Sequence, residues 1–251
     1  MGDILRVAAD KTTIELHNVS MHYNMVKEKV EHIKEYVIKF AKRQLHYENF
    51  VALENINIEI KKGDVFGIVG LNGSGKSTLL KIISGILTPT KGTVRTRGTI
   101  APLIELGAGF DLELTARENI YLNGSVLGFP RNMIRDHFDE IVDFSEMRDF
   151  LDVPMKNYSS GMIARVGFAV ASLVKPNILI VDEILGVGDF LFQQKCEARI
   201  DEMMADGTTV VIVSHSIDQI ERLCKRVLWL EKGKMRALGD VQGVCCAYKS
   251  I

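Results

Sequence analysis

The sequence predicts an α/β fold with a parallel core sheet, an antiparallel β subdomain near the N-terminus and an inserted α-helical subdomain. Three observations support this prediction. Short apolar runs alternate with helical segments, two strand-like segments precede these runs, and the stretch 115–174 is helical in pattern. With 47% hydrophobic residues, the 251-residue chain can bury one large core, so we expect a single domain over residues 1–251.

Composition narrows the function classes. A net charge of −1 gives no indication of a nucleic-acid-binding protein. The four cysteines contain no C-x-x-C pair, so reduced thiols are expected rather than disulfides or a zinc site. No run approaches the roughly 18 to 20 apolar residues of a membrane-spanning helix, and the first ten residues do not resemble a signal peptide. We therefore expect no transmembrane segment in this chain.

The N-terminal part predicts two strands separated by a helical insert. Ile14 and Leu16 mark the first strand, and Ile56, Ile58 and Ile60 alternate with polar residues in the second. Between them, at about residues 24–49, apolar residues recur at spacings of four and three, which indicates one face of an amphipathic helix. These residues are Val26, Val30, Ile33, Val37 and Phe40.

The core strands are predicted by three apolar runs rich in β-branched residues. They are "VFGIV", "ILIVDE" and "TVVIVSH", at residues 65–69, 178–183 and 209–215. Such runs are typical of parallel strands that are covered on both faces. Helices are expected after the first two, at "GKSTLLKIISGIL" and "FLFQQKCEARIDEMMA". The helical subdomain, at about 105–175, contains a capping box from Thr115 to Glu118. Near the C-terminus, "VLWLEKGKMRAL" predicts two short strands around a turn.

The segment "GLNGSGKST", Gly70 to Thr78, fits the pattern G-x-x-x-x-G-K-[ST] between a buried strand and a helix. Glycines allow the backbone to wrap around phosphates, and N–H groups at a helix start favour anions. The segment therefore predicts a P-loop NTPase core that binds ATP. Lys76 would reach the β- and γ-phosphates, and Ser77 would bind Mg²⁺. The residues expected at the nucleotide are Gly70, Asn72, Gly73, Ser74, Gly75, Lys76, Ser77 and Thr78.

Two further strands end in polar residues. Asp182 and Glu183 follow the run "ILIV", where Asp182 suits a Mg²⁺ site and Glu183 suits a general base that activates water. His215 follows the run "TVVIV" and would lie at the same edge of the sheet, in contact with the γ-phosphate. A histidine at a strand end can also have a purely structural role.

With these three motifs the chain resembles the ATPase subunits of ABC transporters. In that family the motif L-S-G-G-Q precedes the Asp-Glu strand, and "YSSGM", Tyr158 to Met162, stands in its place. The resemblance implies that Ser159, Ser160 and Gly161 face the γ-phosphate bound by a second copy of the chain, in a head-to-tail dimer. The residues alone also favour Ser159 as the N-cap of the following helix, and both roles can hold together.

The resemblance assigns three further positions. Tyr23 corresponds to the aromatic residue that stacks on adenine, with His22, Tyr47 and Phe50 as alternatives. Asp189 corresponds to a loop that contacts the partner subunit. The family's coupling glutamine is absent, and Glu105 lies near its place. Glu105 could bind Mg²⁺, although a carboxylate there would repel the γ-phosphate unless a metal screens it.

Longer phrases, including "IELGAGFDLELTARENIYLNG" and "DEILGVGDFLFQQKC", are similar to ATPase subunits that export bacterial surface polysaccharides such as O-antigen and wall teichoic acid. This resemblance implies a peripheral protein on the cytoplasmic face of the inner membrane, which drives a lipid-linked polysaccharide through a separate integral membrane permease. Some members carry a C-terminal carbohydrate-binding domain, which is not expected here because the sequence stops at Ile251.

Two alternatives stay open. The chain could be a soluble ABC ATPase, such as one for iron–sulfur assembly, that is not coupled to transport. The insert at about 24–49 could pack on the chain's own sheet, or its basic face could lie near lipid headgroups or glycan phosphates.

Overall fold

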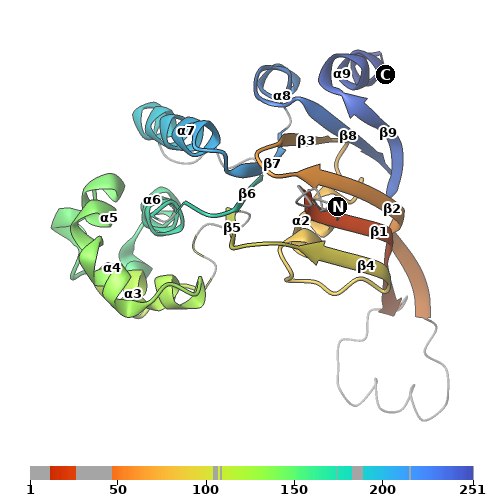
Figure 1. Cartoon of the computed structure of the whole chain (residues 1–251). Coiled ribbons are helices and arrows are strands. Elements are labelled where there is room, and N and C mark those ends of the chain that lie inside the picture. The colour runs from red at the N-terminus through yellow and green to blue at the C-terminus, as the bar shows by residue number, and fades with distance from the viewer. Residues whose placement is uncertain are drawn as a thin grey trace, which may run out of the picture.

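The computed structural model describes residues 12–26, 47–103, 107, 109–173, 175–182, 189–214 and 216–250. Two sheets pack on one shared hydrophobic core, and a helical subdomain projects from one end of the larger sheet (Figure 1). The larger sheet has the strand order β5-β6-β7-β3-β8-β9 and is parallel except for β9. Its strands are β3 (Val65–Val69), β5 (Ile100–Leu103), β6 (Ile178–Asp182), β7 (Thr209–Val213), β8 (Arg226–Glu231) and β9 (Lys234–Asp240).

The three predicted core strands are confirmed as β3, β6 and β7. Their alternate residues point to opposite faces of the sheet, so Ile178 and Ile180 join one core cluster while Leu179 and Val181 join another. Burial on both faces explains why these strands are apolar throughout.

The smaller sheet is antiparallel, with strand order β2-β1-β4. Its strands are β1 (Thr12–Val26), β2 (Tyr47–Lys61) and β4 (Lys91–Thr96). Backbone pairing continues to Val26 opposite Tyr47, so both ends of the predicted insert, 24–26 and 47–49, are strand. The helix predicted to include Val26 is therefore wrong at this residue, because backbone pairing between β1 and β2 continues to it. The rest of the predicted insert, 27–46, lies outside the described residues.

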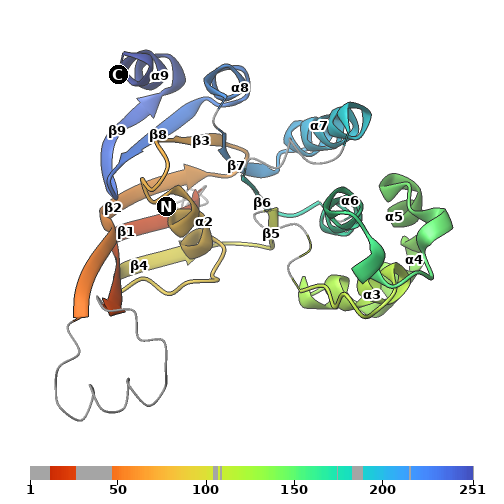
Figure 2. The same ribbon diagram turned by 180° about the vertical axis from the view of Figure 1, so that it is seen from behind.

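Helices cover both faces of the larger sheet (Figure 2). The helix α2 (Lys76–Ile83) lies between the two sheets, whereas α7 (Phe190–Ala205), α8 (Ile217–Leu223) and α9 (Val241–Lys249) lie on the other face. The helix predicted at "FLFQQKCEARIDEMMA" is confirmed as α7, and the helix predicted after the P-loop is confirmed as α2.

The helical subdomain contains α3 (Ala116–Val126), α4 (Arg131–Asp136), α5 (Phe138–Ser145), two 3₁₀ turns (Arg148–Phe150 and Met155–Asn157) and α6 (Ser160–Ala171). The predicted capping box is present, since Thr115 N–H donates to the Glu118 carboxylate at 2.8 Å. Helix α6 joins the subdomain to the sheet, because its Val166 packs inside the subdomain and its Phe168 packs against the sheet cluster.

The cysteines are free thiols. Cys196, Cys224 and Cys245 are buried, whereas Cys246, on α9, is exposed. Burial raises the pKa of both Cys196 and Cys224 to about 12. In the described part of the chain, no helix combines the length and apolar character needed to cross a bilayer.

Candidate nucleotide-binding site

The P-loop lies at the carboxyl edge of the larger sheet, between β3 and α2. Strand β7 separates β3 from β6, and the three strands are parallel, so Asp182 at the end of β6 lies at this same edge. Ligands of open α/β sheets bind at this edge. Three predicted site residues, Glu105, Glu183 and His215, lie outside the described residues, and their roles stay predictions.

The backbone of the P-loop is pressed between two neighbouring strands. Gly75 has a φ of 105°, and a Cβ at this position would lie 2.7 Å from the carbonyl oxygen of Ala52 in β2. A Cβ at Gly70 would lie 2.3 Å from the carbonyl oxygen of Leu230 in β8. Both distances are shorter than any side chain tolerates, so only glycine fits at these two positions.

Lys76 is buried at the base of the loop. Its ammonium Nζ donates to the carbonyl oxygens of Gly70 and Leu71 at 2.7 and 3.2 Å. The positive charge thus lies inside the curve of the loop, where phosphate oxygens would replace carbonyl oxygens as acceptors. The loop is closed by a hydrogen bond from Ser74 N–H to the Leu71 carbonyl oxygen at 3.1 Å.

A pocket of about 360 Å³ opens beside the loop. The first N–H groups of a helix have no acceptor within it, and in α2 these groups belong to pocket residues. The N-terminus of the helix therefore adds positive potential where the pocket would take an anion. The lining residues are Phe50, Ala52, Asn72, Gly73, Gly75, Lys76, Ser77 and Thr78.

The aromatic residue in this lining is Phe50, half exposed on β2. Tyr23, predicted to stack on adenine, lies opposite Phe50 in the β1–β2 register and packs partly buried against the core. Neither Tyr23 nor His22 belongs to the pocket lining. Among the described side chains, Phe50, one of the predicted alternatives, is thus the ring that lines the pocket beside the P-loop.

The segment "YSSGM" begins α6. Ser159 is the N-cap and accepts a hydrogen bond from Met162 N–H at 3.2 Å, which confirms the predicted capping role. Tyr158 is buried and donates its hydroxyl to the Phe150 carbonyl oxygen at 2.6 Å, so it anchors the start of the helix. Ser159 and Ser160 are exposed, and the pocket beside the P-loop includes no residue of α6.

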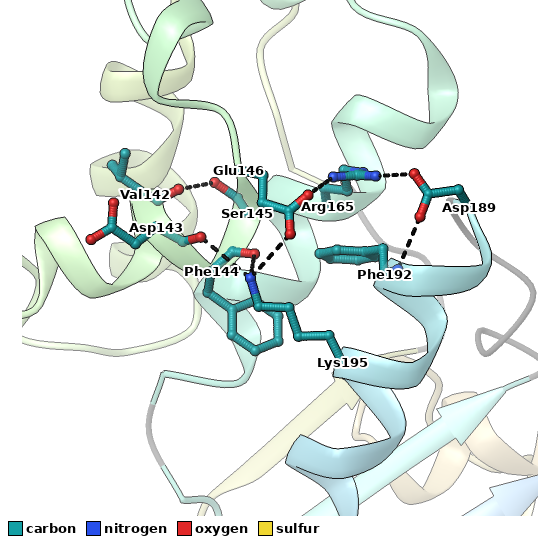
Figure 3. A network of polar contacts seen from close by, with 9 residues as sticks. All are labelled: Val142, Asp143, Phe144, Ser145, Glu146, Arg165, Asp189, Phe192 and Lys195. Atoms are coloured by element: carbon teal, nitrogen blue, oxygen red, sulfur yellow. Dashed lines mark hydrogen bonds and ion pairs between the residues drawn. The ribbon is translucent and has the colours of Figure 1, made fainter.

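Arg165 connects α6 to its neighbours (Figure 3). Its guanidinium lies between the carboxylates of Glu146 and Asp189 and stacks on the Phe192 ring at 4.7 Å from the centroid. Asp189 caps α7 by accepting from Phe192 N–H at 3.0 Å. The network thus joins the start of α7 to the helix that carries Ser159. Sequence reasoning missed Arg165, although it is the one charged residue in α6.

Lys195 of α7 extends this network to the end of α5. Its ammonium donates to the Phe144 carbonyl oxygen at 2.9 Å and to the Glu146 carboxylate at 3.3 Å. Burial alone would raise the pKa of Glu146, but hydrogen bonds from Arg165 and Lys195 outweigh it and hold this pKa below its usual value. The pKa of Asp189 is lowered by the Phe192 N–H and by Arg165. A lowered pKa stabilises the fold above the unfolded-state pKa, and this stabilisation is lost as pH falls through the folded-state value.

Replacing Arg165 by Met should lower the free energy of unfolding. The lost contact with the Phe192 ring by itself accounts for about 1 kcal/mol of this change. Urea unfolding at neutral pH measures this change. The matched control is Arg148→Met, because Arg148 pairs with two exposed carboxylates and lies over no ring of the described residues. Equal stability of the two variants would contradict the prediction. The loss of unfolding free energy in Arg165→Met, relative to the parent chain, should be smaller at acid pH, because Glu146 is then protonated and its ion pair with Arg165 no longer stabilises the parent.

Replacing Phe50 by Ala should weaken ATP binding about tenfold, since stacking of a base on an aromatic ring is worth about 1–3 kcal/mol. Titration calorimetry with Mg²⁺ and ATP measures this affinity. Tyr23→Ala is the matched variant. Because Tyr23 packs on the core, this variant should have a lower free energy of unfolding than the parent but nearly the same affinity for ATP. A larger loss of affinity in Tyr23→Ala would assign the stacking to Tyr23 instead.

Comparison with known proteins gives one family. A family described as ABC transporter matches residues 53–186. The O-antigen export system ATP-binding protein RfbB of Klebsiella pneumoniae is 42% identical over 238 residues, which are 94% of this chain and 97% of the relative. The teichoic acids export ATP-binding protein TagH of Bacillus cereus is 37% identical over 95% of this chain and 43% of its own length.

Solved structures show the same fold. The ATP-binding subunit of an ABC transporter is 21% identical with a TM-score of 0.73, covering 95% of this chain and 94% of its own. A dimeric ATP-binding cassette bound to ADP and phosphate is 25% identical with a TM-score of 0.71, covering 91% and 98%. These matches agree with the P-loop at the carboxyl edge of a parallel sheet and with the capped helix that begins within "YSSGM". The chain belongs to the ABC transporter family.

Proposed function

We propose that this chain is the ATP-hydrolysing subunit of an exporter that moves a lipid-linked cell-surface polysaccharide, of the O-antigen or teichoic acid type, across the cytoplasmic membrane. The supporting observation is the 42% identity that extends over 97% of an O-antigen export ATP-binding protein. The exporter relatives favour this function over a soluble ABC ATPase, such as one for iron–sulfur assembly. The chain would work as a peripheral protein at the cytoplasmic face, bound to a separate membrane permease.

In this proposal ATP occupies the pocket beside the P-loop. The triphosphate would follow the loop and the first turn of α2, and Lys76 would exchange the carbonyl oxygens of Gly70 and Leu71 for β- and γ-phosphate oxygens. The base would lie toward Phe50, at the β1–β2 side of the pocket.

The donors at this edge of the sheet fit Mg²⁺. Ser77 offers a hydroxyl and Asp182 a carboxylate, which are the oxygen ligands that this ion prefers. Mg²⁺ takes few protein ligands and completes its shell with phosphate oxygens and water, which suits a site built from these two side chains. When bound, the ion would neutralise charge on the phosphate oxygens. Glu105 would be a further ligand in the same proposal.

Hydrolysis would use residues that directly follow the core strands. Glu183, next to Asp182, would accept a proton from the water that attacks the γ-phosphorus, and the bond to the β–γ bridging oxygen would break with release of ADP and phosphate. Lys76 and His215 would stabilise the negative charge on the transferred group. This assignment rests on sequence adjacency to β6 and β7, since Glu183 and His215 lie outside the described residues.

A second copy would complete each site. One chain offers the P-loop pocket, which includes no residue of α6, while Ser159, Ser160 and Gly161 start α6 on the surface. Helix N-terminal N–H groups and a serine hydroxyl suit the γ-phosphate held by the other copy. The similarity to a dimeric cassette supports a dimer, and in this proposal its two copies are arranged head to tail. Asp189 would contact the partner and, through Arg165, would move together with α6.

The shared site can be tested by mixing two inactive variants. Glu183→Gln should bind ATP without hydrolysing it, and Ser159→Arg should block turnover by occupying the anion position of the partner's site. In a mixed dimer, one site combines Glu183 of one copy with Ser159 of the other and is intact, so a mixture should regain phosphate release that neither variant shows alone. No recovery in verified mixed dimers, or full turnover by either variant, would contradict the shared site.

The export assignment is tested by affinity purification of the tagged chain from detergent-solubilised membranes of its host. A polytopic membrane protein should copurify in stoichiometric amount. The rate of ATP hydrolysis in this sample should differ from that of the chain without the membrane protein. Lys76→Ala is the control for turnover, because it should keep the partner while losing ATP hydrolysis. Copurification of soluble iron–sulfur assembly proteins alone would leave the ATP site standing and overturn export.

A further inference from the structure

The turn between β8 and β9, residues 231–234, contacts the P-loop at Ser74. Gly233 N–H donates to the Ser74 carbonyl oxygen at 3.0 Å, and the Gly233 carbonyl oxygen accepts from Glu54 N–H at 2.8 Å. A single residue of the turn therefore bridges the P-loop and strand β2. These are backbone contacts, so their geometry depends on how closely the main chains approach.

The approach at Gly233 leaves no room for a side chain. Its φ is +78°, and a Cβ would lie 2.6 Å from the carbonyl oxygen of Ala52. The same Ala52 oxygen faces Gly75 of the P-loop, where a Cβ would lie 2.7 Å away. At the other end of the loop, Gly70 faces the carbonyl oxygen of Leu230, the residue before the turn. The P-loop is thus held on two sides, by β2 and by the end of β8.

Side chains do not fill the space beneath the loop. A cavity of about 150 Å³ is lined by residues 71–74 of the P-loop and residues 229–232. The Ser74 hydroxyl is buried at this cavity and has no hydrogen-bond partner within the described residues. Ser74, which accepts the hydrogen bond from Gly233, thus lies beside a loosely filled space, where packing alone would not fix the position of the loop.

We infer that Gly233 is a positioning residue for ATP binding, which sets the P-loop against β2 at the height where its N–H groups and Lys76 meet the phosphates. Ala52, which contacts Gly233, also lines the nucleotide pocket together with Phe50, so the turn positions both walls of the pocket. This inference rests on the proposal that ATP occupies this pocket.

The test compares Gly233→Ala with Gly63→Ala in the full chain. Gly63 lies in the turn between β2 and β3 with the same φ of +78°. Within the described part of the chain, a Cβ there would meet the Gly207 carbonyl oxygen alone, at 3.6 Å, which is an ordinary contact. Both variants place Ala in the left-handed region, so both should unfold at a lower temperature. Only Gly233→Ala should also weaken the binding of Mg²⁺ and ATP, by about tenfold, which corresponds to about 1.4 kcal/mol.

Equal affinities in the two variants, or equal losses, would overturn the inference, because strain at any turn would then explain the result. If Gly233→Ala does not fold, hydrogen exchange of the parent chain gives a second test. Binding is reciprocal, so Mg²⁺ and ATP should slow exchange in residues 231–234 and leave the turn at Gly63 unchanged. Lys76→Ala should abolish this protection. Bound ATP without protection of 231–234 would overturn the role of Gly233, whereas a parent chain that binds no ATP would overturn the proposed function itself.

Discussion

The close approach of the P-loop backbone to carbonyl oxygens of neighbouring strands is the constraint on which the nucleotide site depends. A phosphate-binding loop must direct N–H groups inward, and such a backbone is stable only if its outer side is supported. Here the support comes from Ala52 of β2 and Leu230 of β8. Strand β2 is itself held by apolar burial, since Leu53, Ile56 and Ile58 belong to the cluster between the two sheets. The geometry of the site is therefore set by the hydrophobic core around it.

The helical subdomain is attached to the sheet by a different combination of forces. Phe168 of α6 packs against Phe144 and Phe192, at ring-centroid distances of 5.7 and 6.4 Å, while Arg165 adds charged contacts above these rings. Small rotations of α6 change the energy of the apolar contact little, whereas they disturb the ion pairs, which have a preferred geometry. Helix α6 and the start of α7 therefore form one mechanical unit, and a displacement of either is transmitted to the other.

Sequence reasoning recovered the elements whose pattern is dictated by burial on both faces or by a local cap. Strands β3, β6 and β7 are short, mostly apolar runs, and α7 has a helical pattern, so the sequence predicts that these elements exist. Their ends were less well predicted, because the runs read for β6 and β7 continue past Asp182 and Val213, where the two strands end. Strands β4 and β5 and helices α8 and α9 were not predicted. Strand β4 is largely exposed and, among the described strands, pairs with β1 alone, so its identity depends on a partner distant in the sequence.

The candidate site divides in the same way. The P-loop and the N-cap Ser159 have local signatures and were found. Phe50 reaches the pocket through the register of β1 with β2, and Gly233 reaches Ser74 across the fold. Both contacts join residues that are distant in the sequence, so no sequence pattern predicts them. The extension of pairing to Val26 was likewise missed, because the helical spacing of apolar residues does not reveal a backbone ladder.

The cysteines give the chain uneven chemical reactivity. Thiol reagents attack the thiolate, and burial keeps Cys196 and Cys224 protonated with pKa values of about 12. Cys245 is also buried and its pKa is raised, which leaves Cys246 as the accessible thiol among the described residues. A maleimide dye or spin label would therefore react at Cys246 in α9, far along the chain from the P-loop. The natural sequence thus carries its own attachment point for distance measurements between two copies.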